Sequence, residues 1–195
     1  MSPRSNLTKE TVVQAAAEWL NTEGSEALSL GRLADKLGIR TPSLYNHVEG
    51  LPGLRRELSI LNARMLAERL NDAALGRSGP ELVKVVMYTI RSYIKEYPGL
   101  YLSTVRASGT QTEVDPELQQ EEARSVKVGL AVMASFGLEG EDAIHAVRGL
   151  RSLVHGFATL EISGGFGMSL DLDESFARLV ELFITGLQQP HSHLA

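Results

Sequence analysis

Polar side chains that could contact nucleic acid lie in one short segment, residues 29–48. The hydroxyl of Tyr45 and the ring N–H of His47 can donate hydrogen bonds to phosphate oxygens. The Asn46 amide could reach a base edge or a phosphate. Ser29 and Arg32 are further phosphate candidates, because a helix starting here would add its own N-terminal N–H groups. These side chains could thus contact DNA, provided that the segment folds so as to present them together.

Two short helices around a glycine are expected to position these side chains. Leucine and alanine recur at helical spacing through residues 30–37, and Gly38 can then adopt a positive φ and end the helix. Thr41 can cap a second helix, and Pro42 suits its first position because it has no N–H to lose. The apolar residues that follow give this helix a buried side. Such a helix-turn-helix places its second helix in the major groove of DNA.

The same segment resembles the DNA-binding domain of tetracycline-repressor (TetR) family regulators. The pair Tyr45 and His47 matches the residues with which that family contacts the DNA backbone, and the resemblance covers roughly the first quarter to third of the chain. The residues that carry it are Val12, Ala16, Leu20, Gly24, Leu33, Ala34, Leu37, Gly38, Ile39, Leu44, Tyr45, His47 and Val48.

At the start of the second helix, the resemblance implies contacts with bases. Arg40, Thr41 and Ser43 lie where family members place base-contacting residues, and Pro42 can touch a thymine methyl group. Tyr45 leaves two interpretations open. It could pack against the preceding helix or contact DNA, and both are compatible because its ring can pack while its hydroxyl faces outward.

The chain departs from the family pattern at Leu51. Residues 49–53 are expected to form a turn, and a lysine usually follows in the family, beginning the next helix and touching the DNA backbone. Leu51 cannot make that contact. Arg55 and Arg56 could compensate, or they could form a solvated face of that helix.

Net charge is unevenly distributed along the 195 residues. Residues 1–56 carry seven Lys and Arg against six Asp and Glu, whereas residues 57–195 carry twelve against eighteen. The acidic excess thus lies away from the predicted recognition helix. Because the N-terminal part is only weakly basic, we expect modest, salt-sensitive non-specific DNA binding.

The absence of cysteine excludes disulfides, thiolate metal sites and a cysteine nucleophile. No apolar run is long enough to span a bilayer, and no signal-peptide pattern opens the chain. These features predict a cytoplasmic protein without a membrane partner.

The whole chain predicts an all-α fold of about nine helices. Thr8 is expected to cap the first helix and Gly24 to end it, while Asp171 is expected to cap the last. Residues 103–116 are rich in Ser, Thr and Gly and predict a loop. The expected organisation is a three-helix DNA-binding domain over residues 1–52, with its helix-turn-helix at 29–48. A helical ligand-binding and dimerisation domain would follow over residues 53–195.

The last two predicted helices are apolar around much of their circumference, which favours a symmetric helical interface. A homodimer would supply two recognition helices for two half-sites, and the family typically dimerises through its last two helices. The candidate interface residues are Gly149, Leu153, Gly156, Leu160, Phe176, Leu179, Val180, Phe183 and Ile184.

Aromatic, methionine and histidine side chains in the second domain could line a small-molecule pocket. Taken one by one, each is better explained by core packing. The collective case rests on the family, whose members typically hold an effector in this domain, and the segment around His155-Gly156 also resembles one TetR-like branch. The candidates are Met65, Met87, Tyr88, Tyr93, Tyr97, Tyr101, Met133, Phe136, His145 and His155.

Catalysis is not predicted. His155 could act as a base with Glu161 or Asp142, but no nucleophile elbow, P-loop or dinucleotide fingerprint accompanies it. Asp171 and Asp173 are better explained as loop and cap residues than as metal ligands, so neither a metal nor a cofactor is expected. The expected partners are operator DNA, an unknown small-molecule effector and a second copy of the chain. The alternative is a helical scaffold or ligand carrier without specific DNA binding.

Overall fold

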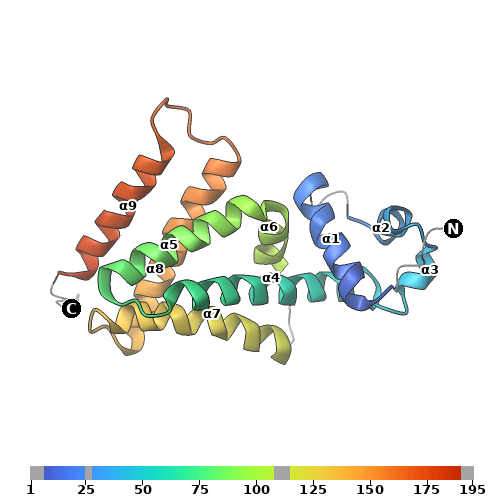
Figure 1. The fold of residues 1–195 in the computed structure, drawn as a ribbon, viewed down its shortest axis with the longest axis horizontal. Helices are drawn as coiled ribbons and strands as arrows, with labels where there is room; N and C mark the ends of the chain where they lie inside the picture. Colours follow the sequence, from blue (N-terminus) through green and yellow to red (C-terminus); the bar gives the residue numbers. More distant parts are fainter. Residues whose placement is uncertain (1–6, 25–27, 108–114, 190–195) are drawn as a thin grey trace. The chain divides into compact units, whose positions relative to one another are not determined.

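The computed structural model describes residues 7–24, 28–107 and 115–189, and this part of the chain forms nine α-helices and no strand (Figure 1). The all-α prediction is confirmed. The helices are α1 (Lys9–Glu23), α2 (Leu30–Leu37), α3 (Thr41–Leu44), α4 (Gly50–Ala74), α5 (Gly79–Glu96), α6 (Pro98–Ala107), α7 (Pro116–Ala134), α8 (Gly140–Ile162) and α9 (Leu172–Leu187).

The chain folds into two compact units that are each discontinuous in sequence. Unit 1 comprises Met1–Met65 and Tyr97–Glu122, and unit 2 comprises Leu66–Glu96 and Ala123–Ala195. Helices α4 and α7 contribute residues to both. The predicted boundary after residue 52 separates a DNA-binding part from a ligand-binding part of the chain. The two compact units do not test these functions, so this boundary stays a prediction.

Local capping signals begin and end several helices as predicted. The Thr8 hydroxyl accepts a hydrogen bond from the Thr11 N–H at 3.3 Å, and Gly24 ends α1 with φ 79°. Gly38 ends α2 in the left-handed conformation, with φ 67° and ψ 30°. Asp171 caps α9 through bonds from two backbone N–H groups. These signals need only neighbouring residues.

Three local predictions are wrong. The N-cap of α3 is Arg40, which makes no side-chain cap bond, so Thr41 is the first helical residue and not the cap. Residues 49–53 are not a separate turn, because α4 already begins at Gly50. Pro52 is tolerated there, since the first turn of a helix needs no N–H from it. The predicted loop is helical up to residue 107 and again from Pro116, and residues 108–114 lie outside the described part.

The larger core of unit 1 includes residues of the helix-turn-helix and α6. Gly99 lets α6 lie directly on the end of α1: a Cβ at this position would lie 1.8 Å from the Leu20 carbonyl oxygen. The Leu100 N–H donates to Asn21 Oδ1 at 3.0 Å. Fully buried members of this core are Val12, Ala16, Leu20, Leu33, Leu44, Leu54, Leu58 and Leu100.

Unit 2 packs α5, α8 and α9 around its own core, and a charged residue lies within it. The Arg91 side chain is only 5% exposed, and it binds the Glu161 carboxylate through Nε and Nη2 at 2.7 and 2.8 Å. Its Nη1 lies 2.7 Å from Asp173 Oδ1, and its guanidinium lies 4.8 Å from the Phe176 ring centroid. Arg91 therefore joins α5 to the end of α8 and the start of α9.

Candidate nucleic-acid interface

Helix α2 presents two of the predicted phosphate donors at its first turn. The Ser29 hydroxyl oxygen accepts a hydrogen bond from the Arg32 N–H at 3.3 Å, which makes Ser29 the N-cap. Both side chains are exposed, whereas Leu33 and Ala34 on the opposite face are buried. Because a capping hydroxyl still has its own proton to donate, Ser29 can serve both the helix and a phosphate.

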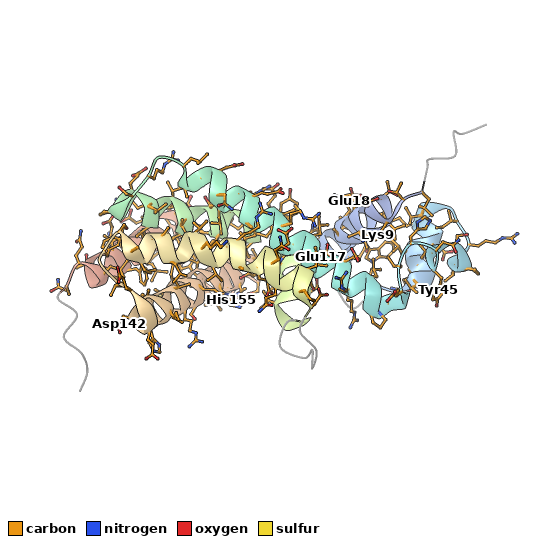
Figure 2. All side chains as sticks on the ribbon, turned by 90° about the horizontal axis from the view of Figure 1, so that it is seen from below. Lys9, Glu18, Tyr45, Glu117, Asp142 and His155 are labelled. Atoms are coloured by element: carbon orange, nitrogen blue, oxygen red, sulfur yellow. The ribbon has the colours of Figure 1, made fainter. Side chains whose placement is uncertain are left out.

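The second helix of the motif is short, and the turn after it carries the most exposed donors. Helix α3 has four residues, and the chain then tightens through a bond from the His47 N–H to the Leu44 carbonyl at 2.9 Å. Leu44 and Val48 anchor this turn in the core with exposures of 0% and 5%. Tyr45, labelled in Figure 2, is 61% exposed between them.

The remaining predicted contacts surround this turn. Arg40, Pro42 and Asn46 are exposed, and Thr41, Ser43 and His47 are half-buried. All nine predicted residues lie in unit 1, and five of them, Ser29, Arg32, Arg40, Tyr45 and Asn46, are exposed and carry side-chain donors. The exposure of Tyr45 favours the interpretation in which its hydroxyl faces outward, although its contact with DNA stays a prediction.

Arg55 and Arg56 differ in their surroundings. Arg56 is held by Asp115 and Glu117, and these carboxylates raise the pKa of its guanidinium above the usual value. Arg55 is exposed, and in the part of the chain that the structure describes it makes no ion pair. Of these two arginines, Arg55 is therefore the better candidate for contacting a DNA phosphate, and this contact stays a prediction.

Comparison with known proteins shows the family to which the chain belongs. Residues 83–183 match the tetracyclin repressor-like C-terminal domain. The HTH-type transcriptional regulator YobS of Bacillus subtilis (strain 168) is 33% identical over 188 residues, which cover 96% of each chain. The chain belongs to the TetR family of DNA-binding transcriptional regulators.

Further relatives of this TetR-family chain extend over nearly its whole length. The HTH-type transcriptional regulator Rv0681 of Mycobacterium tuberculosis (strain ATCC 25618 / H37Rv) is 33% identical, covering 96% of this chain and 84% of the relative. A solved TetR variant from Acinetobacter baumannii AYE, in complex with minocycline, has the same fold with a TM-score of 0.70. It is 23% identical and covers 96% of this chain and 99% of that structure.

The predicted ligand residues of this TetR-family chain fall in different units. Met65, Tyr97 and Tyr101 belong to unit 1, and the other seven belong to unit 2. Among those seven, His145 is exposed and His155 half-buried. The remaining members pack in or beside hydrophobic clusters, with Tyr88 edge-on to Phe176 at 5.1 Å. The pocket stays a prediction, because packing alone accounts for most of these positions.

The predicted interface residues differ in exposure. Phe176, Val180 and Ile184 are buried in the core of unit 2, while Leu179 and Phe183 are partly buried against it. On α8, Leu153 and Leu160 are 37% and 48% exposed, and Gly149 and Gly156 are half-buried. Within unit 2, the candidates still able to contact another molecule are therefore concentrated on α8.

The residues considered for catalysis are not assembled into a reacting group. Burial and the charge of Arg151 lower the pKa of His155, while Glu161 is held by Arg91 and by Lys95 at 2.6 Å. Asp142 lies in the first turn of α8, far along the helix from His155 (Figure 2). Over the described ranges, no cluster of three His, Asp or Glu side chains could hold a metal. In the same ranges, no helix is long and apolar enough to cross a membrane.

Proposed function

We propose that this TetR-family chain is a repressor that binds operator DNA as a homodimer and is released by a small-molecule effector. The observation that carries DNA binding is the exposed Tyr45 and Asn46 on a turn that buried Leu44 and Val48 hold in place. Donors on a rigid support are pre-organised for phosphate and base edges. The protein acts in the cytoplasm and carries out no catalysis.

We assign effector binding to the helices of unit 2, which hold seven of the ten predicted ligand residues. That such a fold can bind a small molecule is supported by the TetR variant that was solved in complex with minocycline. Ligand screening would identify the chemical class of the effector that this chain binds. Its binding would change the affinity for the operator, and by linkage the operator would change the affinity for the effector to the same extent.

The test is binding of the purified protein to DNA spanning its own promoter region, with unrelated DNA as competitor. Tight binding to one palindromic stretch, with whole dimers bound, is expected. Tyr45→Phe should weaken this binding at least tenfold, since a hydrogen bond to a charged group contributes roughly 1.5–3 kcal/mol. His47→Ala should act in the same direction.

The control is Ser92→Ala on α5, which removes a hydroxyl from an exposed side chain outside the helix-turn-helix. It should leave operator binding unchanged. Binding of the wild-type protein that is no tighter to any promoter sequence than to unrelated DNA would favour the alternative of a scaffold or ligand carrier.

A further inference from the structure

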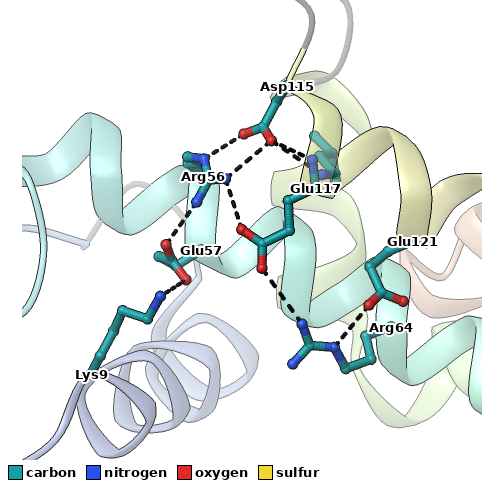
Figure 3. A network of polar contacts seen from close by, with 8 residues as sticks. Lys9, Arg56, Glu57, Arg64, Asp115, Glu117 and Glu121 are labelled. Atoms are coloured by element: carbon teal, nitrogen blue, oxygen red, sulfur yellow. Dashed lines mark hydrogen bonds and ion pairs between the residues drawn. The ribbon is translucent and has the colours of Figure 1, made fainter.

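Within unit 1, a continuous series of ion pairs runs from the start of α7 through α4 to the start of α1 (Figure 3). Helix α4 supplies Arg56, Glu57 and Arg64, which lie along one side of the helix. Helix α7 and the residue before it supply Asp115, Glu117 and Glu121, and α1 supplies Lys9. We call these seven residues the ion network.

Asp115 makes both an ion pair and helix-capping hydrogen bonds. Its carboxylate binds Nε and Nη2 of Arg56, and one of its oxygens also accepts the N–H groups of Glu117 and Leu118 at 3.0 and 3.2 Å. The side chain is 11% exposed. It therefore caps α7 and holds an arginine of α4 at the same time, through charge-assisted bonds that are stronger than neutral ones.

Glu117, in the same turn of α7, pairs with two arginines of α4. One of its oxygens lies 2.9 Å from Arg56 and the other 3.8 Å from Arg64. Beneath these pairs, Leu118 packs against Ile60 and Ala63. Ionic and apolar contacts thus fix the first turn of α7 along α4.

The other end of the ion network reaches the start of α1. Glu57 accepts from Arg56 Nη1 at 2.8 Å and from Lys9 Nζ at 3.0 Å, and Lys9 is the first residue of α1. Helix α1 also packs on the predicted DNA-contacting turn, because its Val12 and Val13 belong to the same buried cluster as Leu44 and Val48.

We propose that Asp115 is a positioning residue for DNA recognition: by holding Arg56, it fixes α1 and the adjacent recognition turn against α4. Operator affinity then depends on the first turn of α7, which lies outside the helix-turn-helix. Displacement of that turn weakens specific binding without removing any contact to DNA. This inference rests on the proposed function, since it concerns the same DNA-contacting surface.

The test is Asp115→Asn in the full-length protein, measured by operator binding over a range of salt concentrations. Asparagine can still cap α7, so the variant removes the charge and keeps the cap. Operator affinity should fall about tenfold, and affinity for unrelated DNA should not change. The slope of log K against log salt should also stay the same, because that slope counts phosphate contacts.

Asp142→Asn is the matched control, since it removes one exposed carboxylate from the first turn of α8. It should leave operator affinity unchanged. Arg56→Gln should lower operator affinity as Asp115→Asn does, and the double variant should lose little more than either single one, because both break the same interaction. If Asp115→Asn does not fold, Glu117→Gln can be tested instead, because the Glu117 side chain is 48% exposed. The expected loss of operator affinity is then smaller.

The possible failures are distinguishable. Wild-type protein that binds its operator specifically, together with an Asp115→Asn variant of equal affinity, would overturn the inference and leave the proposed function intact. A reduced salt slope in Arg56→Gln would also overturn it, because Arg56 would then be a phosphate ligand. Absence of specific binding by the wild-type protein would overturn both.

Discussion

Arg55 and Arg56 are neighbours in the sequence with different surroundings, and this difference leads to a prediction at the scale of single residues. Leu51 and Arg55 are one turn apart on α4, and long side chains on a helix lean towards its N-terminus. Arg55 therefore extends towards the level of Leu51, where the TetR family usually has a phosphate-contacting lysine. Arg56 is committed to Asp115 and Glu117 instead.

Arg55→Gln should weaken binding to operator and unrelated DNA alike. It should reduce the salt slope by about one unit per subunit, because one phosphate contact is lost. Leu51→Lys in the same variant should restore part of the affinity by returning a cation one turn away. Equal salt slopes for Arg55→Gln and the wild-type protein would place Arg55 on a solvated face of α4.

At the scale of elements, the close contact between α1 and α6 requires a residue without a side chain at position 99, which is Gly99. Gly99→Ala would place a Cβ 1.8 Å from the Leu20 carbonyl oxygen, and backbone atoms on both helices must then move apart. We expect a loss of about 1–3 kcal/mol in the free energy of unfolding, as for other overpacked sites. Urea unfolding followed by circular dichroism would measure it.

Gly186→Ala on α9 is the matched control, because a Cβ there meets no heavy atom within 4 Å. Replacing glycine by alanine in a helix usually stabilises it, so this variant should be as stable as the wild-type protein or slightly more stable. Equal effects of the two substitutions would mean that α6 does not depend on its close approach to α1.

The buried pair of Arg91 and Glu161 predicts a pH-dependent stability of unit 2. Hydrogen bonds from Arg91 lower the pKa of Glu161, with Lys95 adding to the effect. A lowered pKa contributes stability above the unfolded-state value of about 4.3, and this stability is lost as the pH falls through the folded-state value. Glu161→Gln should therefore flatten the decline in unfolding temperature below about pH 5.

The same substitution leaves the Arg91 charge buried with a weaker partner. Breaking a buried pair costs about 3–5 kcal/mol, so Glu161→Gln should also lower stability at pH 7. Glu181→Gln provides the comparison, since Glu181 is 60% exposed in its pair with Lys84 and should matter little. If the unfolding temperature of Glu161→Gln declines below about pH 5 as steeply as that of the wild-type protein, other carboxylates control acid unfolding.

These elements also show which features the sequence could predict. Thr8, Gly24, Gly38 and Asp171 act on backbone groups within a few residues, so their roles were predictable from local sequence. Arg56 and Asp115 are 59 residues apart, and Arg91 and Glu161 are 70 apart. No local signal connects such partners. For the same reason, the sequence suggested two roles for Arg56 without indicating that carboxylates of a later helix hold it.

At the scale of the whole molecule, a homodimer is needed to present two recognition helices to two half-sites. The structure narrows the predicted interface: Phe176, Val180 and Ile184 are already buried in unit 2, whereas Leu153 and Leu160 of α8 remain exposed. They lie seven residues apart and hence on one face of the helix. Gly156 between them would allow close approach of a second helix.

Replacing both leucines by glutamate (Leu153→Glu, Leu160→Glu) should therefore convert the protein to a monomer. Burying a leucine contributes about 1.5–3 kcal/mol, and in a symmetric dimer each substitution acts twice. Sedimentation equilibrium would measure the mass, and operator binding should weaken in parallel because each monomer occupies a single half-site. Leu75→Glu, at a 73% exposed leucine outside α8 and α9, should remain dimeric. A double variant that stays dimeric would place the interface on another surface, and a monomer with undiminished operator affinity would mean that one recognition helix is sufficient.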